Sequence, residues 1–154
     1  MVDEKSSWSV AVKLIKAGMR PPVVHAATGL PLKKLRRMYQ QYNGESPTKG
    51  RVQEAAYRCL HKAWQALEAT AYLLVYRNTG GARIWQVLDT NLVLEAFRIY
   101  EGIASPRFID VTKAWYLARD LRERTVEFRR CQRCGKEYLY DQRSAIIQRC
   151  LRCR

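Results

Sequence analysis

The sequence has no long apolar segment: its longest run, residues 69–76, is far shorter than the roughly 20 residues that a membrane-spanning helix needs. Residues 1–5 include two acidic side chains and lack the apolar core of a secretory signal, so we expect a cytoplasmic protein. The chain has two histidines, and we find neither a glycine-rich phosphate loop nor a pattern of paired carboxylates or of an activated nucleophile. These absences argue against a membrane protein and against an enzyme.

Acidic residues are scarce as well. The 154 residues include 14 Asp and Glu against 28 Lys and Arg, which gives a formal net charge of +14 and a pI near 9.9. Such a charge indicates a polyanionic partner, and its spread along the chain favours nucleic acid over a membrane surface. The hydrophobic fraction of 47% is enough for a packed core, and the length allows one ordinary domain or a helical body with a metal-bound appendage.

Four of the five cysteines form two Cys-x-x-Cys pairs near the C-terminus, Cys131 with Cys134 and Cys150 with Cys153. Two residues between the thiols let the chain fold into a knuckle, and Gly135 suits the positive φ that closes it. The pairs therefore predict one structural Zn²⁺ held by four thiolates. Disulfides are disfavoured because nothing in the sequence resembles a secreted protein, and free core thiols because the cysteines fall into matched pairs.

Residues 125–154 predict a small zinc ribbon. Residues 125–129 alternate as a strand does, and the segment 136–149 holds apolar positions expected in further short strands, including Ile146 and Ile147. A four-thiolate site has no open coordination position, so the metal would stabilise the fold and would not activate water. The segment is also rich in arginine, which suits phosphates and guanine edges.

Three helices are expected in residues 1–43. Apolar spacing predicts a helix over 8–17, a short helix that begins at Pro21 and stops at Thr28, and a third helix that Pro31 opens. The third helix would bury Leu32, Leu35, Met38, Tyr39 and Tyr42 and expose Lys33, Lys34, Arg36 and Arg37. This order predicts a helix-turn-helix whose basic helix enters a major groove. An ordinary helical hairpin with a solvated basic face is the alternative.

A linker by composition, residues 44–50, precedes a predicted helical body over 51–124. In this body apolar spacing predicts helices over 52–76, 88–99 and 111–121, with a break at residues 78–81. Asp89 and Asp110 are the expected caps of the last two helices, and Cys59 is expected in the core. The predicted fold is therefore mainly α, with a helix-turn-helix-like N-terminal part and a four-cysteine zinc ribbon at the C-terminus.

Several segments, in this order, resemble a known family. They are LRRMY at 35–39, SPTKG at 46–50, EAFRIY at 95–100 and VTKAWYLAR at 111–119, followed by the paired cysteines. Together they resemble FlhC, the family of bacterial flagellar transcriptional regulators. The resemblance implies a helical subunit that forms a complex with the small helical partner FlhD. It also implies that this complex binds promoter DNA and recruits RNA polymerase. It also implies zinc ligation by Cys131, Cys134, Cys150 and Cys153.

The sequence departs from the family pattern at residues 51–56, where an aromatic-rich segment is expected. The departure bears on the regulated genes more than on the biochemistry. Flagellar promoters are our first expectation. The alternative is control of conjugative transfer genes, because relatives of the family on mobile genetic elements act there.

A DNA-binding activator is the leading hypothesis, and its DNA contacts are expected from two basic sets. The first is Lys33, Lys34, Arg36 and Arg37 on the third helix, and the second is Arg129, Arg130, Arg133 and Lys136 around the ribbon. Two competing hypotheses are an RNA- or ribosome-associated zinc-ribbon protein and a scaffold whose ribbon only docks a partner. The helix-turn-helix pattern disfavours the RNA-associated protein.

Overall fold

The computed structural model describes residues 4–52, 54–106 and 108–153, and it shows a mainly helical chain that divides into two compact units. The first unit contains the residues up to Val52 together with 110–112, and the second contains the remainder. In the described ranges, no helix has both the length and the apolar character that crossing a bilayer requires. The prediction of a mainly α fold is confirmed.

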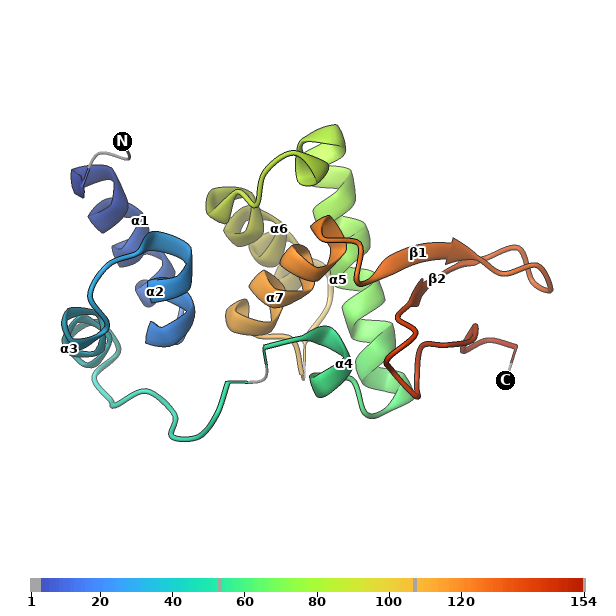
Figure 1. Ribbon diagram of the computed structural model, residues 1–154, viewed down its shortest axis with the longest axis horizontal. Coiled ribbons are helices and arrows are strands. Elements are labelled where there is room, and N and C mark those ends of the chain that lie inside the picture. Colours follow the sequence, from blue (N-terminus) through green and yellow to red (C-terminus); the bar gives the residue numbers. More distant parts are fainter. Residues whose placement is uncertain (1–3, 53, 107, 154) are drawn as a thin grey trace. The chain divides into compact units, whose positions relative to one another are not determined.

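Three helices that each contact the other two form the first unit (Figure 1): α1 (Glu4–Lys16), α2 (Pro21–Thr28) and α3 (Leu32–Asn43). Local sequence explains ends of α2 and α3. Helix α2 starts on proline. Glycines in the left-handed conformation follow the two helices, Gly29 at φ 73° after α2 and Gly44 at φ 70° after α3. The core of this unit contains Ala11, Leu14, Ile15, Met19, Val23, Val24, Leu35 and Tyr39.

The buried face of α3 is narrower than predicted. Leu35 and Tyr39 are buried, whereas Tyr42 is 44% exposed and has the Lys16 ammonium 4.9 Å from the centre of its ring. The basic positions of α3 are all exposed, as expected. The order α2, glycine turn, α3 is the one expected, but the helix-turn-helix and the DNA-reading role of α3 both stay predictions.

The second unit combines helices with one hairpin (Figure 1). Its elements are α4 (Ala56–Cys59), α5 (Ala63–Gly80), the 3₁₀ helix η1 (Gly81–Trp85), α6 (Thr90–Ile103), α7 (Val111–Arg122, apart from its first two residues), β1 (Glu127–Arg130) and β2 (Glu137–Tyr140). Helix α5 packs on α6, and the Tyr72 ring lies at the centre of their contact, 5.9 Å from that of Tyr100 and 6.5 Å from that of Phe97. Helix α5 also contacts β2 and so supports the hairpin.

The single helix predicted over 52–76 is wrong, because α4 and α5 are separate helices; Gln53 lies outside the described residues. The backbone N–H groups of His61 and Lys62 both donate to the side-chain oxygen of Gln65, at 2.9 Å each. The Gln65 side chain accepts two backbone N–H groups that would donate to backbone carbonyls in a continuous helix. Helix α5 therefore begins after Lys62.

The other boundaries in this unit follow the sequence more closely. The break expected at residues 78–81 falls at the end of that range. Helix α5 continues to Gly80, and the next residue, Gly81 at φ 54°, terminates the helix. Asp89 caps α6 as predicted, accepting the N–H groups of Asn91 at 2.9 Å and Leu92 at 3.3 Å. Cys59 is 3% exposed, as expected for a core residue.

Candidate metal centre

The first cysteine pair lies in the turn of the hairpin. β1 pairs antiparallel with β2, so that Arg130 lies opposite Glu137 at the end of the ladder. The Cys131 N–H then donates to the Lys136 carbonyl, and the Gly135 N–H donates to the Cys131 carbonyl, each at 2.8 Å. Gly135 has φ 70°, the left-handed conformation that the sequence predicted for it. The backbone therefore closes a tight knuckle around the first two thiols.

The second pair is carried by the loop that follows β2. Asp141, 1% exposed, accepts the Arg143 backbone N–H at 2.9 Å and the Arg143 guanidinium at 3.0 and 2.8 Å. Ser144 Oγ accepts the N–H groups of Ile146 at 3.2 Å and Ile147 at 3.4 Å. These side-chain-capped turns replace the strand expected around Ile146 and Ile147, so that prediction is wrong. Buried Ile147 anchors the loop.

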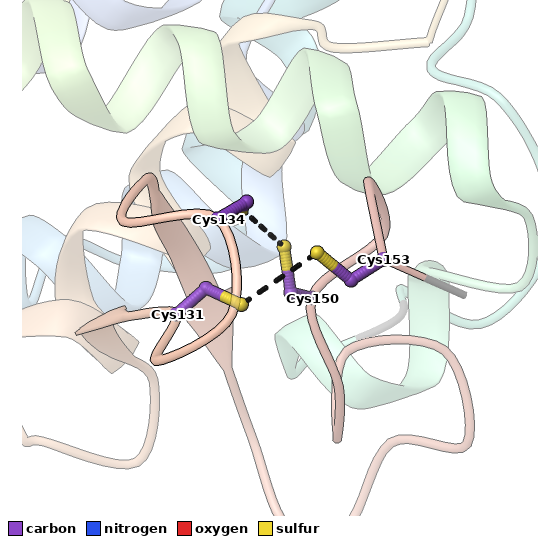
Figure 2. Close-up of side chains that lie close together, drawn as sticks. All are labelled: Cys131, Cys134, Cys150 and Cys153. Atoms are coloured by element: carbon purple, nitrogen blue, oxygen red, sulfur yellow. Dashed lines mark hydrogen bonds between the residues drawn. The ribbon is translucent and has the colours of Figure 1, made fainter.

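The two pairs meet with their sulfurs facing one point (Figure 2). All four Sγ atoms lie within 4.8 Å of one another, with Cys131 and Cys153 3.8 Å apart and Cys134 and Cys150 3.7 Å apart. These separations are far beyond the ~2.05 Å of a disulfide. Four sulfurs placed tetrahedrally at ~2.3 Å from Zn²⁺ are about 3.8 Å apart. The cluster therefore fits a single tetrahedral metal ion.

The thiols differ in acidity. Hydrogen bonds from the backbone N–H groups of Cys134 and Arg133 lower the pKa of Cys131 to about 7. The thiol contact with Cys134, and then desolvation, raise the pKa of Cys153 to about 12. The polypeptide alone thus favours the ionisation of Cys131 and opposes that of Cys153, and a divalent cation among the sulfurs would compensate the charge of the thiolates.

A basic groove of about 610 Å³ adjoins the cysteines. Three of the predicted DNA contacts, Arg129, Arg130 and Arg133, line it together with Arg149. Sequence reasoning did not select Arg149 as a contact, although its position directly before Cys150 was a usable signal. Lys136 is exposed but is not among the residues that line this groove. Lys33, Lys34, Arg36 and Arg37 are exposed on α3, in the other unit.

Two of these arginines already have partners. The Arg129 side chain lies 3.3 Å from Glu127 Oε2, and Arg133 Nη1 donates to the Cys153 carbonyl at 3.4 Å. The second contact joins the first knuckle to the last cysteine, so the arginine side chain helps to hold the two cysteine pairs together.

The chain resembles known proteins over its whole length. The sequence model of the family described as flagellar transcriptional activator (FlhC) matches residues 1–154. The chain belongs to this family. The flagellar transcriptional regulator FlhC of Verminephrobacter eiseniae is 26% identical over 158 residues, covering 97% of this chain and 84% of the relative. Its counterpart in Thauera aminoaromatica is 26% identical, and the match covers 90% of this chain and 72% of the relative. The counterpart in Gallionella capsiferriformans is 24% identical, and the match covers 90% of this chain and 78% of the relative.

The resemblance inferred from the short segments is therefore confirmed over the whole chain. FlhC proteins are transcription regulators, which is not a class of enzymes. The four close cysteines of this family member could hold a metal ion. A site with four cysteine ligands has no open position and would stabilise the fold.

Proposed function

We propose that this protein is the DNA-binding subunit of a transcription activator that acts on flagellar promoters in the cytoplasm. The observation that carries the proposal is the match of the FlhC family over the whole chain. The net charge of +14 supports a nucleic-acid partner, because the protein can neutralise several phosphates at once. In this proposal the chain works in a complex with an FlhD-like helical subunit and recruits RNA polymerase.

We further propose that Cys131, Cys134, Cys150 and Cys153 bind one structural Zn²⁺. Their sulfur–sulfur separations support zinc, and so does an all-thiolate donor set. A hairpin of two four-residue strands is too small to be stable alone, so the metal would supply much of its folding free energy. The role of the metal toward DNA would then be indirect, because the metal would hold the surrounding arginines as one surface.

Two basic surfaces would share the DNA contacts. Helix α3 exposes Lys33, Lys34, Arg36 and Arg37, and we propose that it lies in a major groove. Beside the metal centre, the arginines of the basic groove would contact phosphates and fix the register of the protein on the duplex.

Exposed apolar side chains support a protein partner. Ile99 and Ile103 lie one turn apart on α6 and are 43% and 72% exposed, and Leu67 on α5 is 52% exposed. We propose that an FlhD-like subunit covers these side chains, because large exposed apolar residues are a common feature of subunit interfaces.

The test measures binding of the protein, purified with its partner, to a fluorescent flagellar promoter duplex over a range of salt concentrations. Arg37→Glu in α3 should weaken binding and reduce the salt slope by about 0.9 for the lost phosphate contact. Lys13→Glu is the matched control, since Lys13 is an exposed cation of α1 in the same unit. Equal weakening by both variants would assign binding to net charge alone and remove α3 from the interface.

A further inference from the structure

One face of the β1–β2 hairpin carries two tyrosines and an arginine. In the ladder Glu127 lies opposite Tyr140 and Arg129 lies opposite Tyr138. Because alternate residues of a strand point to opposite faces, these four side chains share one face, which we call the aromatic face. The other face carries Leu139, which is 1% exposed and packs into the protein. The aromatic face remains half-exposed.

Two grooves meet on the aromatic face, and Arg129 lines both. The first has a volume of about 300 Å³ and is lined by Tyr140, and the second is the basic groove of about 610 Å³, lined by Tyr138. Because the two grooves share Arg129, we treat them as one track past both tyrosines. Its arginines in the described part of the chain are Arg124, Arg129, Arg130, Arg133, Arg143 and Arg149.

The charge of this track suits a polyanion. The acidic side chains that the described residues contribute to it are Glu127 and Asp141, which pair with Arg129 and Arg143. The six arginines therefore outnumber the two carboxylates. The track keeps a net positive charge even when the negative charge of a Zn²⁺ centre with four thiolates is counted. Electrostatics alone would accept any phosphate chain.

The stacking geometry narrows the choice. The guanidinium carbon of Arg129 lies 3.3 Å from the centre of the Tyr140 ring, and Glu127 holds the guanidinium there from 3.3 Å. The Arg129 side chain is 47% exposed, so part of this stacked layer is open to a ligand. Aromatic rings and guanidinium planes are the surfaces on which proteins stack unpaired bases. The bases of a duplex are already stacked on their neighbours and cannot use them.

We propose that the aromatic face binds a short single-stranded stretch of RNA. One base stacks on Tyr138, another stacks on the Arg129–Tyr140 layer, and the arginines at both ends of the track hold the phosphates. We commit to RNA, since proteins recognise RNA mainly at single-stranded loops, bulges and ends, whose unstacked bases pack on aromatic rings and arginine planes. This activity is separate from duplex binding through α3, but it uses arginines of the basic groove that the proposed function assigns to duplex phosphates.

The test measures fluorescence anisotropy of labelled oligouridine with the full-length, zinc-loaded protein at near-physiological salt. Wild-type protein should bind saturably, and Tyr138→Ala and Tyr140→Ala should each weaken binding by about five- to a hundredfold. Tyr138→Phe and Tyr140→Phe keep the rings and should bind within about threefold of wild type. Zinc content and circular dichroism check that each variant is folded.

Three outcomes would overturn the proposal. They are the absence of saturable oligouridine binding, alanine variants that bind like wild type, and tighter binding of oligothymidine than of oligouridine. Arg37→Glu, the α3 variant that should weaken promoter binding, should leave oligouridine binding unchanged. Failure of the promoter function would therefore appear as lost duplex binding with retained RNA binding, and the two proposals stay distinguishable.

Discussion

The carboxylate of Asp120 in α7 accepts the backbone N–H of Ala56, the first residue of α4, at 2.7 Å across 64 positions of sequence. Asp120 is 2% exposed, and its second oxygen accepts from the Arg119 guanidinium at 2.7 Å. Arg119 also donates to the Glu54 carbonyl. One buried carboxylate and its arginine thus fix both the start of α4 and the backbone of Glu54 before it.

Asp120→Ala should destabilise the second unit by about 2–4 kcal/mol, because it leaves the buried Ala56 N–H without its acceptor and removes the carboxylate that pairs with Arg119. Asp120→Asn should cost less, since the amide oxygen can still accept the Ala56 N–H. The measurement is the urea midpoint followed by circular dichroism.

Glu123→Ala is the control for this pair of variants. The Glu123 carboxylate is 46% exposed and lies 4.0 Å from Arg119 Nε, so its loss should change stability by less than about 0.5 kcal/mol. If Glu123→Ala and Asp120→Ala shifted the midpoint equally, the contact with Ala56 would not be the source of the stability.

Contacts of this kind explain why the division of residues 52–76 into α4 and α5 could not be predicted. Residues 52–76 hold a regular apolar spacing without glycine or proline, which predicts one helix. The competing acceptors are Asp120, far away in sequence, and the Gln65 side chain, whose partners are His61 and Lys62. Periodicity carries no information about such contacts.

The cysteine cluster could be predicted because its geometry is local. Each Cys-x-x-Cys pair forms a knuckle from neighbouring residues, and Gly135 marks the closure of the first knuckle. The basic groove could be predicted only in part, because Arg149 reaches it through a loop whose path depends on turns at Asp141 and Ser144. Short apolar runs such as Ile146–Ile147 suit a strand or a buried loop equally well.

Gly135→Ala should weaken metal binding. At φ 70° an added Cβ meets no atom within 4 Å, so the cost is conformational and about 1 kcal/mol. Because the knuckle folds as the metal binds, this cost should appear as about fivefold weaker zinc affinity in a chelator competition.

Gly102→Ala is the matched control for Gly135→Ala. Gly102 lies within α6, and an added Cβ again meets no atom within 4 Å. There alanine should stabilise the helix by up to about 1 kcal/mol and leave zinc affinity unchanged. Unchanged affinity in Gly135→Ala would show that the left-handed turn contributes nothing to the site.

Removal of the metal should unfold the hairpin and leave the helices. We expect one equivalent of zinc per chain in wild-type protein, and loss of zinc in Cys131→Ser and in Cys150→Ser, since each variant removes one of the four ligands and one of the two contacts between the cysteine pairs. Cys59→Ala should keep its zinc, because Cys59 is buried at the end of α4. Zinc is measured by elemental analysis and helicity by circular dichroism. Full zinc in either serine variant would contradict the four-thiolate site.

Ile103→Glu should block assembly with the helical partner and leave the chain itself folded. Ile103 is 72% exposed, so a charge there costs the isolated chain less than about 0.5 kcal/mol. In an interface the same carboxylate would be buried without a partner, which should weaken association at least tenfold. Asn91→Glu, at an exposed position in the first turn of the same helix, adds the same charge and should assemble normally. Co-purification of the partner in wild-type amounts with Ile103→Glu would place the interface on another surface, because a buried, unpaired carboxylate cannot be accommodated without loss of affinity.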